Sequence, residues 1–170
     1  MTGSAPFELR TARLLLRPLA TDDLDALHPV LTDEAVRRHL FDGETISRDF
    51  LRAAIENSTR HFAERGWGLY GIVRGDDGVR GVCGFHMVGT PPERQLVYAL
   101  APELWGQGYG REAVGAVVGH VRSLRPAGAV VADVDASNRA SAALLRALGF
   151  KAEVRMIARG RDIIRFALPR

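Results

Sequence analysis

The sequence is poor in the features that mark secreted, membrane and metal-binding proteins. Cys83 is its single cysteine, so no disulfide can form within the chain, which is typical of a reducing compartment. It lacks the charged start and apolar segment of a signal peptide, and no apolar run approaches the length needed to cross a bilayer. Its five histidines show no metal-ligand spacing. We therefore expect a cytoplasmic protein with no membrane segment and no metal.

Lysine and blocks of positive charge are also scarce. Lys151 is the only lysine, and the arginines are scattered along the chain. A net charge of +3, with a sequence pI near 9.6, suits a polyanionic ligand but is too small to indicate nucleic acid by itself. We expect no direct nucleic-acid binding.

The chain does contain enough apolar sequence for one compact domain. Its 170 residues, 46% hydrophobic and 25% charged, are ordinary for a soluble globular protein. No repeat, low-complexity run or interdomain linker divides the sequence. We predict a single domain over residues 1–170, with a core of about 9–168.

Apolar periodicity predicts seven strands and five helices. Strand 94–100, helix 110–123 and strand 129–135 form a β–α–β unit, which implies a parallel pair with a right-handed crossover. Hairpins on either side imply antiparallel neighbours, so we predict an α/β (α+β) fold with a mixed, mostly antiparallel twisted sheet and helices on both faces. The other strands are expected at 13–19, 67–74, 79–88, 152–158 and 163–168, and the other helices at 21–31, 33–39, 47–64 and 138–148, with a helix break at 126–128.

Apolar residues recur at helical spacing in three of these helices, and Thr21 is predicted as the N-cap of the first helix. In helix 47–64 the recurring residues are Phe50, Leu51, Ala54, Ile55 and Phe62, and in helix 110–123 one face is predicted to carry Ala113, Val114, Val117, Val118 and Val121. In helix 138–148 the residues expected to point inward are Ala140, Ala143, Leu144, Ala147 and Leu148.

The most informative stretch joins strand 94–100 to helix 110–123. Residues 101–113 read APELWGQGYGREA, with glycines at 106, 108 and 110. The unpaired N–H groups of a first helical turn and the helix dipole favour an anion there, and glycine lets the backbone approach it without an intervening Cβ. We expect this loop to hold the pyrophosphate of a nucleotide-type cofactor.

Two better-known phosphate-binding loops fit these glycines less well. A dinucleotide fingerprint needs Gly-x-Gly-x-x-Gly near the first strand of a parallel sheet, whereas the spacing here is Gly-x-Gly-x-Gly late in the chain. A nucleoside-triphosphate loop needs Gly-Lys followed by Ser or Thr, which is missing. A glycine-rich turn that only eases helix packing stays open as an alternative.

The surrounding residues carry a family resemblance. LAPELWGQGYGREA at 100–113, followed 27 residues after Arg111 by NRASAALLRALGF, resembles the GNAT superfamily of acyl-CoA N-acyltransferases. With RTARLLLRPL at 10–19, the chain resembles more narrowly the RimJ/RimL-type branch, which includes ribosomal-protein-alanine N-acetyltransferases. The superfamily has Gln or Arg where Trp105 stands, and tryptophan is frequent there in this branch. The resemblance implies the acyl-CoA N-acyltransferase fold, in which the central parallel strands splay apart.

By this resemblance acetyl-CoA is the co-substrate and its pantetheine arm lies in the splay. Leu100 would offer its backbone N–H to the thioester carbonyl, as in an oxyanion hole. Asn138 would contact the arm or help to place the substrate, besides serving as an N-cap. Arg111 would add a charge-assisted contact, unless it is a solvated first-turn arginine. The implied cofactor-binding set is Leu100, Trp105, Gly106, Gln107, Gly108, Tyr109, Gly110, Arg111, Asn138 and Ser141.

The resemblance also bears on proton transfer. The leaving thiolate needs a proton or a hydrogen bond, and many superfamily members use a tyrosine at the position of Leu145, so that route is closed here. Ser141 is the branch's substitute, unless it is only a small helix-packing residue. The implied catalytic set is therefore Ser141, Asn138 and the backbone N–H of Leu100.

The base that accepts the proton of the amine stays open. The branch often has an acidic residue three places before Tyr98, where this chain has Gln95. The remaining candidates could each equally be surface or structural groups; they are Glu44, Glu56, His86, Glu93 and Glu103.

We therefore predict an N-acetyltransferase that moves an acetyl group from acetyl-CoA to a primary amine by direct attack. The acceptor is a protein N-terminus or a small amine such as a polyamine, an amino-sugar antibiotic or another metabolite. Gln95 and Leu145 lend weight to an alternative from another class, a non-catalytic acyl-CoA-binding or regulatory module of the same fold. A homodimer is compatible with the sequence but not required by it.

Overall fold

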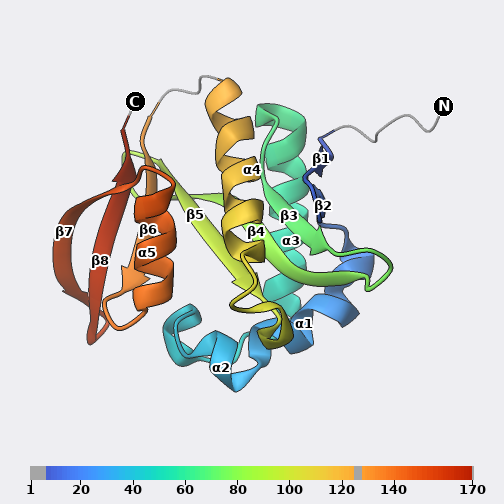
Figure 1. Cartoon of the computed structure of the whole chain (residues 1–170), viewed down its shortest axis with the longest axis horizontal. Coiled ribbons are helices and arrows are strands. Elements are labelled where there is room, and N and C mark those ends of the chain that lie inside the picture. Colours follow the sequence, from blue (N-terminus) through green and yellow to red (C-terminus); the bar gives the residue numbers. More distant parts are fainter. Residues whose placement is uncertain (1–6, 125–127, 170) are drawn as a thin grey trace.

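One mixed sheet organises the chain. The computed structural model describes residues 7–124 and 128–169, which form an eight-stranded sheet with helices on both faces (Figure 1). The strand order is β1-β2-β3-β4-β5-β6-β8-β7, and all neighbours are antiparallel except β5 and β6. The predicted mixed, mostly antiparallel sheet with a central parallel pair is confirmed.

The elements have the following bounds. The strands are β1 Leu9–Arg10, β2 Leu15–Pro18, β3 Leu69–Val73, β4 Val79–Val88, β5 Glu93–Leu100, β6 Val130–Asp135, β7 Lys151–Ala158 and β8 Arg161–Leu168. The α-helices are α1 Leu24–Thr32, α2 Glu34–Arg37, α3 Arg48–Arg65, α4 Tyr109–Ser123 and α5 Arg139–Ala147. Three short 3-10 helices are η1 Thr21–Asp23, η2 Phe41–Gly43 and η3 Pro102–Leu104.

The first strand and the first helix differ from prediction. The sequence does not predict β1, because two residues are too few to show a period-2 pattern. The N-cap of α1 is Asp23, not Thr21. The Asp23 carboxylate is turned back to accept bonds from Arg17 at 2.7 and 2.8 Å and from the Ala20 N–H at 2.8 Å, which places η1 ahead of the helix. The second helix ends at Arg37, and residues 126–127 of the predicted break lie outside the described residues.

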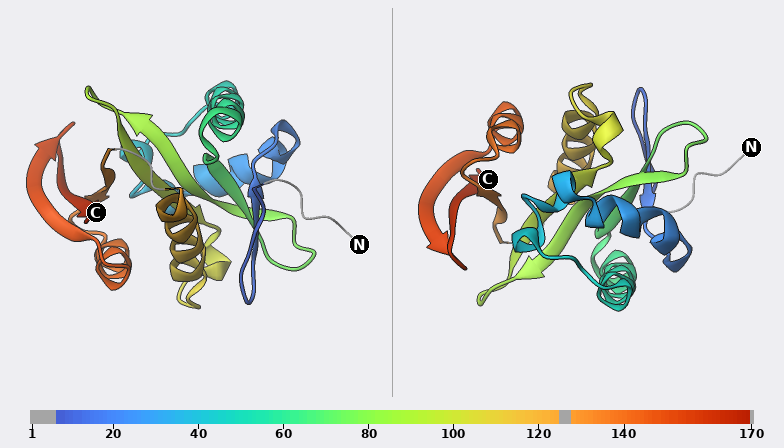
Figure 2. Two further views of the ribbon diagram at one scale, coloured as in Figure 1. Left: turned by 90° about the horizontal axis from the view of Figure 1, so that it is seen from above. Right: turned by 90° about the horizontal axis from the view of Figure 1, so that it is seen from below.

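The helices cover the sheet from two sides. In Figure 2, α4 and α5 lie on one face, while α1 and α3 lie on the other. The predicted inward face of α4 is confirmed, since all five of its expected residues are buried.

The predicted inward face of α5 is partly wrong. Its buried residues are Ala142 and Leu145, whereas Ala140, Ala143 and Ala147 are exposed because they line the central cleft. In α3 Phe50 is 54% exposed and Ser58 is buried. Ser58 can be buried because its Oγ accepts a hydrogen bond from the backbone N–H of Leu69 at 2.6 Å.

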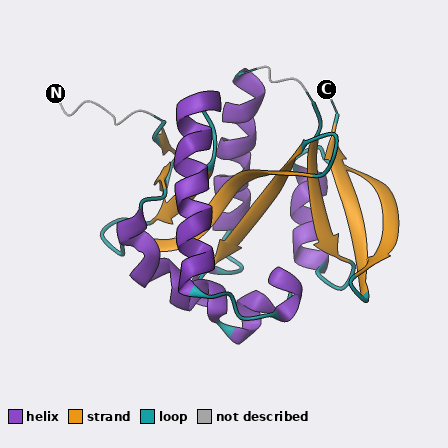
Figure 3. Ribbon diagram, turned by 180° about the vertical axis from the view of Figure 1, so that it is seen from behind, coloured by secondary structure: helices purple, strands orange, loops and turns teal. Residues whose placement is uncertain are grey.

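The parallel strands β5 and β6 pair over a short distance only. Their register consists of Arg94 opposite Val130 and Gln95 opposite Val131. Beyond these residues the two strands diverge toward the Leu100 end, and the short α2 segment lies beyond the widening gap (Figures 1 and 3). The sheet therefore opens at its centre. No helix among the described residues is long and apolar enough to span a membrane.

Candidate active site

A cleft of about 1520 Å³ lies where β5 and β6 part. One side is formed by the end of β5, the glycine loop and the start of α5, and the other by α2, η2 and the β7–β8 hairpin. Of the sequence-predicted cofactor set, the cleft is lined by Leu100, Trp105, Gly106, Gly108, Tyr109, Gly110, Arg111, Asn138 and Ser141. Gln107 is the exception, because its side-chain amide turns away and donates to the carbonyl of Glu103 at 2.8 Å.

The glycine loop has the backbone geometry that only glycine adopts readily. Gly106 and Gly108 have φ angles of 72° and 82°, in the left-handed region. Gly108 is the N-cap of α4, and no side chain caps that helix end. The first N–H groups of α4 therefore face the cleft region with no partner inside the helix, and the helix dipole favours an anion there. The loop has the chemistry of a pyrophosphate seat.

A clamp from the N-terminal segment fixes this loop from behind. The Arg13 guanidinium donates to the carbonyl of Gln107 at 2.9 Å and to the Glu112 carboxylate at 2.7 Å. Thr11 donates its hydroxyl to Glu112 at 2.5 Å, and the Arg13 guanidinium lies 4.2 Å from the centre of the Tyr109 ring. Bonds from Thr11 and Arg13 outweigh burial and lower the pKa of Glu112, so the clamp is ionised at neutral pH.

The end of β5 directs a backbone donor into the gap. The Ala101 N–H donates to the Arg80 carbonyl of β4 at 2.9 Å. Because successive residues of a strand point their backbone groups to opposite sides, the N–H and C=O of Leu100 point away from β4. The indole N–H of Trp105 donates to that Leu100 carbonyl at 2.8 Å. The Leu100 carbonyl therefore already accepts a hydrogen bond, while the Leu100 N–H faces the space between the strands.

Two hydroxyls meet across the same space. The hydroxyls of Tyr98 on β5 and Ser141 on α5 lie 2.5 Å apart. Burial raises the pKa of Tyr98, so this phenol stays protonated at neutral pH. Asn138 accepts a bond from the Ser141 N–H at 3.1 Å, so it is the N-cap of α5 while also lining the cleft. The pair can donate a proton or a hydrogen bond to a group bound beside Leu100.

Of the five candidate bases, only His86 lines the cleft. Glu93 pairs with Arg165 at 3.1 Å, and Glu103 pairs with Arg80. Glu44 is exposed beside η2, and Glu56 lines a separate shallow pocket beside α3. The sequence-predicted bases are therefore not brought together at the cleft.

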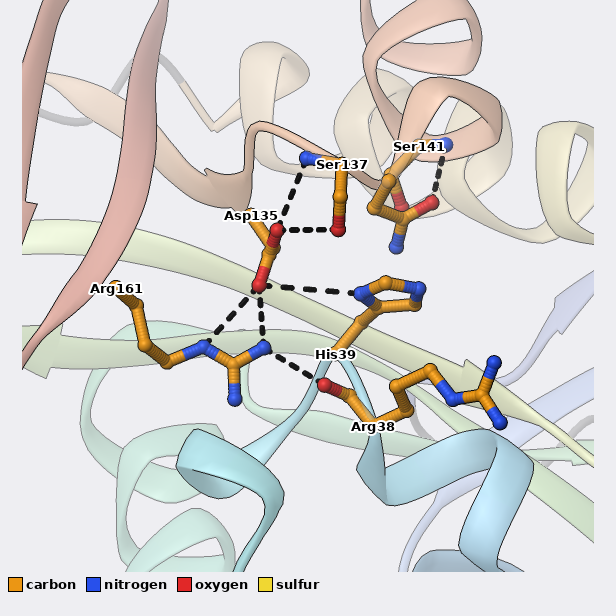
Figure 4. A network of polar contacts seen from close by, with 7 residues as sticks. Arg38, His39, Asp135, Ser137, Ser141 and Arg161 are labelled. Carbon is orange, nitrogen blue, oxygen red and sulfur yellow. Dashed lines mark hydrogen bonds and ion pairs between the residues drawn. The ribbon is translucent and has the colours of Figure 1, made fainter.

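Ion pairs stabilise the wall of the cleft that lies opposite the glycine loop. Asp42 pairs with Arg159 at 2.8 Å and Asp133 with Arg165 at 2.8 Å, while Asp135 pairs with Arg161. Figure 4 shows the third pair with His39, Ser137 and the Arg38 carbonyl gathered around it. The rest of this wall is partly apolar, with Phe41 and Phe50 in an edge-on contact at 6.0 Å.

Sequence reasoning misses Arg13, Tyr98 and His39 as site residues. Tyr98 lies in the predicted strand 94–100, and only the fold, which closes a 43-residue separation from Ser141, reveals its partner. Arg13 lies within the RTARLLLRPL segment, but its contact with a loop 94 residues later leaves no local pattern. His39 follows a helix with no motif around it.

The residues present fit an acyl-CoA rather than a metal. No group of three or more His, Cys, Asp or Glu side chains in residues 7–124 and 128–169 could hold a metal ion. Cys83 is buried, and burial raises the pKa of its thiol, which leaves it unreactive. The splayed strands, the uncapped glycine loop and the direction of the Leu100 N–H together fit an elongated thioester with a pyrophosphate.

Comparison with known proteins agrees with this geometry. The family model described as "Acetyltransferase (GNAT) domain" matches residues 13–151. The chain is 29% identical over 150 residues to the uncharacterized N-acetyltransferase p20 of Bacillus licheniformis, covering 85% of this chain and 83% of that protein.

Two solved structures share the fold. A putative GNAT-family acetyltransferase from Bordetella pertussis has a TM-score of 0.79 and 21% identity, covering 95% of this chain and 99% of its own. RimL, a ribosomal L7/L12 α-N-protein acetyltransferase solved with coenzyme A, has a TM-score of 0.74 and 23% identity, covering 92% and 94%.

The family match over residues 13–151 and the relatives named N-acetyltransferases identify an acyltransferase. The chain belongs to the GNAT acetyltransferase family.

Proposed function

We propose that this protein transfers an acetyl group from acetyl-CoA to a primary amine by direct attack of the amine on the thioester. The observation that carries the proposal is a convergence in one cleft. The glycine-loop donors, the Leu100 N–H and the Tyr98–Ser141 hydroxyl pair all face the space between the splayed strands. A thioester bound there meets both an oxyanion donor and a proton donor.

The glycine loop and α4 hold the donor. Backbone N–H groups from Gly106 through Arg111 bind the pyrophosphate, and the pantetheine arm lies along the gap toward Leu100. A Cβ at Gly110 would make only ordinary van der Waals contacts, at 3.4 Å from Leu144 and 3.5 Å from Leu100, so the start of α4 borders both side chains without crowding. Arg111 is exposed beside the cleft and adds a charge-assisted contact.

The chemistry divides between backbone and hydroxyl groups. The Leu100 N–H stabilises negative charge on the thioester carbonyl oxygen, and Trp105 keeps the neighbouring Leu100 carbonyl occupied. Ser141, backed by Tyr98, donates to the leaving sulfur. Leu145 is buried in the core and has no proton to donate. Tyr98 therefore provides the phenol that the resemblance would place at position 145.

The wall opposite the glycine loop, formed by α2, η2 and the β7–β8 hairpin together with the β6 carboxylates, is called the acceptor wall. It favours an amine that carries no second positive charge. Each of its three carboxylates, on Asp42, Asp133 and Asp135, is paired with an arginine. A polyamine would have to displace these arginines, whereas a protein N-terminus or an apolar monoamine would not. Phe41 and Phe50 offer an apolar contact beside them. We therefore propose a protein N-terminus or an apolar small amine as the acceptor class.

The test is a pair of hydroxyl deletions. Ser141→Ala and Tyr98→Phe should lower kcat by about 100-fold, the lower range for losing a general acid, with little change in acetyl-CoA affinity. Ser123→Ala, a serine that bonds only the last turn of α4, is the matched control. Free-thiol release from acetyl-CoA measures turnover, and unchanged turnover at saturating substrates removes the pair from the mechanism.

A non-catalytic CoA-binding module is distinguished by the same assay. Thermal stabilisation by millimolar CoA without thiol release on any amine or peptide would favour the module. Absence of any stabilisation would exclude both functions, because a ligand that binds only the folded state must raise its stability.

A further inference from the structure

We propose that His39 is the general base that takes the proton from the amine, and that Asp135 holds it in place. This inference rests on the proposed function, because it assigns a residue for a step of that reaction. His39 lies in the turn after α2 and lines the cleft across from the wall that carries Leu100 and Ser141. None of the five sequence-predicted bases occupies this position.

The two nitrogens of His39 have different surroundings. Nδ1 is buried, has no hydrogen-bond partner among the described residues and lies 3.9 Å from Oδ2 of Asp135, which is within ion-pair distance but too long for a hydrogen bond. The side chain as a whole keeps 29% of its surface accessible. In Figure 4 Nδ1 is turned toward Asp135 and Nε2 points away from it. With its proton on Nδ1, the neutral ring presents the Nε2 lone pair to the cleft.

Asp135 is built as a fixed anion. Its Oδ1 accepts the Ser137 N–H at 2.9 Å and the Ser137 hydroxyl at 2.6 Å. Its Oδ2 accepts from Nε of Arg161 at 3.1 Å and also from Nη2 of the same guanidinium. These bonds outweigh burial and lower the pKa of Asp135 to about 2, so the carboxylate stays ionised wherever the enzyme works.

The same arginine ties the carboxylate to the turn that carries the histidine. Arg161 donates from Nη2 to the Arg38 carbonyl at 2.7 Å, one residue before His39. Asp135 on β6, Arg161 on β8 and the turn after α2 therefore form one unit (Figure 4). A base beside a fixed carboxylate is the arrangement in which an imidazole is oriented and its protonated form stabilised.

His86 is the rival base in the cleft, and its surroundings differ. It hydrogen-bonds the Gln95 side chain, and Gln95 in turn donates to Asp133 at 2.9 Å. Burial is the largest cause that lowers the pKa of His86. No carboxylate therefore contacts this ring directly among the partners that the structure describes.

The proton and the electron pairs of the reaction balance. Nε2 of neutral His39 takes one proton from the protonated amine, which leaves the nitrogen lone pair free. The nitrogen then forms a bond to the thioester carbonyl carbon, and the carbon–sulfur bond breaks. The sulfur leaves with the electron pair of that bond and receives a proton from the Ser141–Tyr98 pair. The attacking nitrogen loses its second proton as the amide forms, and that proton restores the Ser141–Tyr98 pair. His39 returns its proton to water.

Charged groups from several elements surround His39. Asp135 faces it from β6, Arg161 stands behind that carboxylate from β8, and Arg37 and Arg38 belong to its own segment. Farther along the wall, Asp42 pairs with Arg159 at 2.8 Å. The charged group nearest to the ring is the Asp135 carboxylate, at 3.9 Å from Nδ1.

The first test needs no turnover. Nitrogen NMR of the ¹⁵N-histidine-labelled protein, assigned with His39→Gln, reports which nitrogen carries the proton in the neutral ring. We expect the proton on Nδ1 in the free protein. A proton on Nε2 would overturn the proposal, because the cleft-facing nitrogen could then not act as the base.

The second test is kinetic. Thiol release from acetyl-CoA is measured with Ala- and Ser-initiated hexapeptides, 2-phenylethylamine and spermidine, and the fastest acceptor is used. His39→Gln should lower kcat/KM for the amine by about 100-fold and remove the acidic limb of its pH profile, with CoA affinity unchanged. Added imidazole should partly restore His39→Ala. Asp135→Asn should also shift that limb, whereas the matched control His86→Gln should retain it.

The outcomes separate the two proposals. If the wild-type protein and His39→Gln release thiol at the same rate with the same pH profile, the base assignment alone is overturned. The same holds if His86→Gln loses the acidic limb of the pH profile and His39→Gln keeps it. No release by the wild-type protein with any amine overturns the proposed function and the base role with it. Circular dichroism and a CoA-induced thermal shift confirm that each variant is folded.

Discussion

The two walls of the cleft are held by different kinds of interaction. The donor wall, formed by the end of β5, the glycine loop and the start of α4, is shaped by its backbone. It combines left-handed glycines, an uncapped helix start and the alternating N–H direction of β5. The acceptor wall consists of side-chain ion pairs on short elements, with Asp42, Asp133 and Asp135 each meeting an arginine. Backbone geometry suits a co-substrate that is always the same, whereas a wall of side chains can be altered one residue at a time.

The difference predicts which changes affect which substrate. Substitutions in the glycine loop should affect CoA binding, and substitutions in the ion pairs should affect the amine. The glycine loop should show the largest effect and the acid stability of the acceptor wall the smallest. A glycine-loop variant that changes only amine binding, or an ion-pair variant that changes only CoA binding, would contradict this assignment.

Gly108→Val should weaken CoA binding by at least about tenfold, equal to about 1.4 kcal/mol. Valine is strained at a φ of 82°, and its Cβ would lie 3.4 Å from Nη2 of Arg13, so the substitution disturbs both the backbone of the loop and the clamp that holds it. Gly78→Val is the matched control, because Gly78 has a φ of 70° with nothing within 4 Å and lies in the β3–β4 hairpin. Isothermal titration with CoA measures both, and equal losses would point to general destabilisation instead.

Arg161→Gln should raise KM for the amine by about tenfold, because the loss leaves Asp135 partly unpaired and frees the turn before His39. CoA affinity should not change. Arg155→Gln, which removes an exposed pair with Asp162 on the same hairpin, is the control. A matching change in CoA affinity would show that the two walls are coupled.

Arg13→Gln should weaken CoA binding by about three- to fivefold, or roughly 1 kcal/mol, because Arg13 is 44% exposed and solvent screens its charge. The loop would lose its bonds to Gln107 and Glu112 but keep its glycines. Arg74 also reaches the Tyr109 ring, at 5.9 Å, and Arg74→Gln is the control that should leave CoA affinity unchanged. Equal effects of the two variants would assign the loss to the aromatic contact.

The acid stability of the acceptor wall gives the smallest effect. The pKa of Asp135 in the folded protein is lowered to about 2 from its ordinary value of 3.8, so its ionisation stabilises the fold above the unfolded value. This contribution is lost as pH falls through the folded value. The difference in unfolding free energy between wild type and Asp135→Asn, from urea titrations, should therefore shrink as the pH falls from about 4 toward about 2. A constant difference would show that another group is responsible.

The donor wall could be predicted from sequence because it depends on local patterns. A glycine loop between a strand and an amphipathic helix specifies its own backbone, and nine of the ten predicted cofactor residues line the cleft. The β–α–β unit predicted the parallel pair, and the apolar face of α4 was predicted in full. The roles assigned to these residues stay predictions until they are tested.

The acceptor wall could not be predicted because its contacts join distant parts of the chain. Arg161 bonds the Arg38 carbonyl across 123 residues, and Arg159 bonds Asp42 across 117. No local spacing encodes such pairs. The inward face of α5 was partly wrong for a different reason, because Ala140, Ala143 and Ala147 line the cleft and not the core. The two-residue β1 is too short to show a period.

The most direct test of the account is amine-dependent thiol release from acetyl-CoA by three proteins: wild type, Gly108→Val and Gly78→Val. We predict release that saturates with acetyl-CoA in wild type and Gly78→Val, and at least about tenfold less release from Gly108→Val at subsaturating acetyl-CoA. Equal release from all three would contradict the glycine loop as the donor seat. Absence of release from all three, with CoA bound, would contradict the acetyl-transfer function itself.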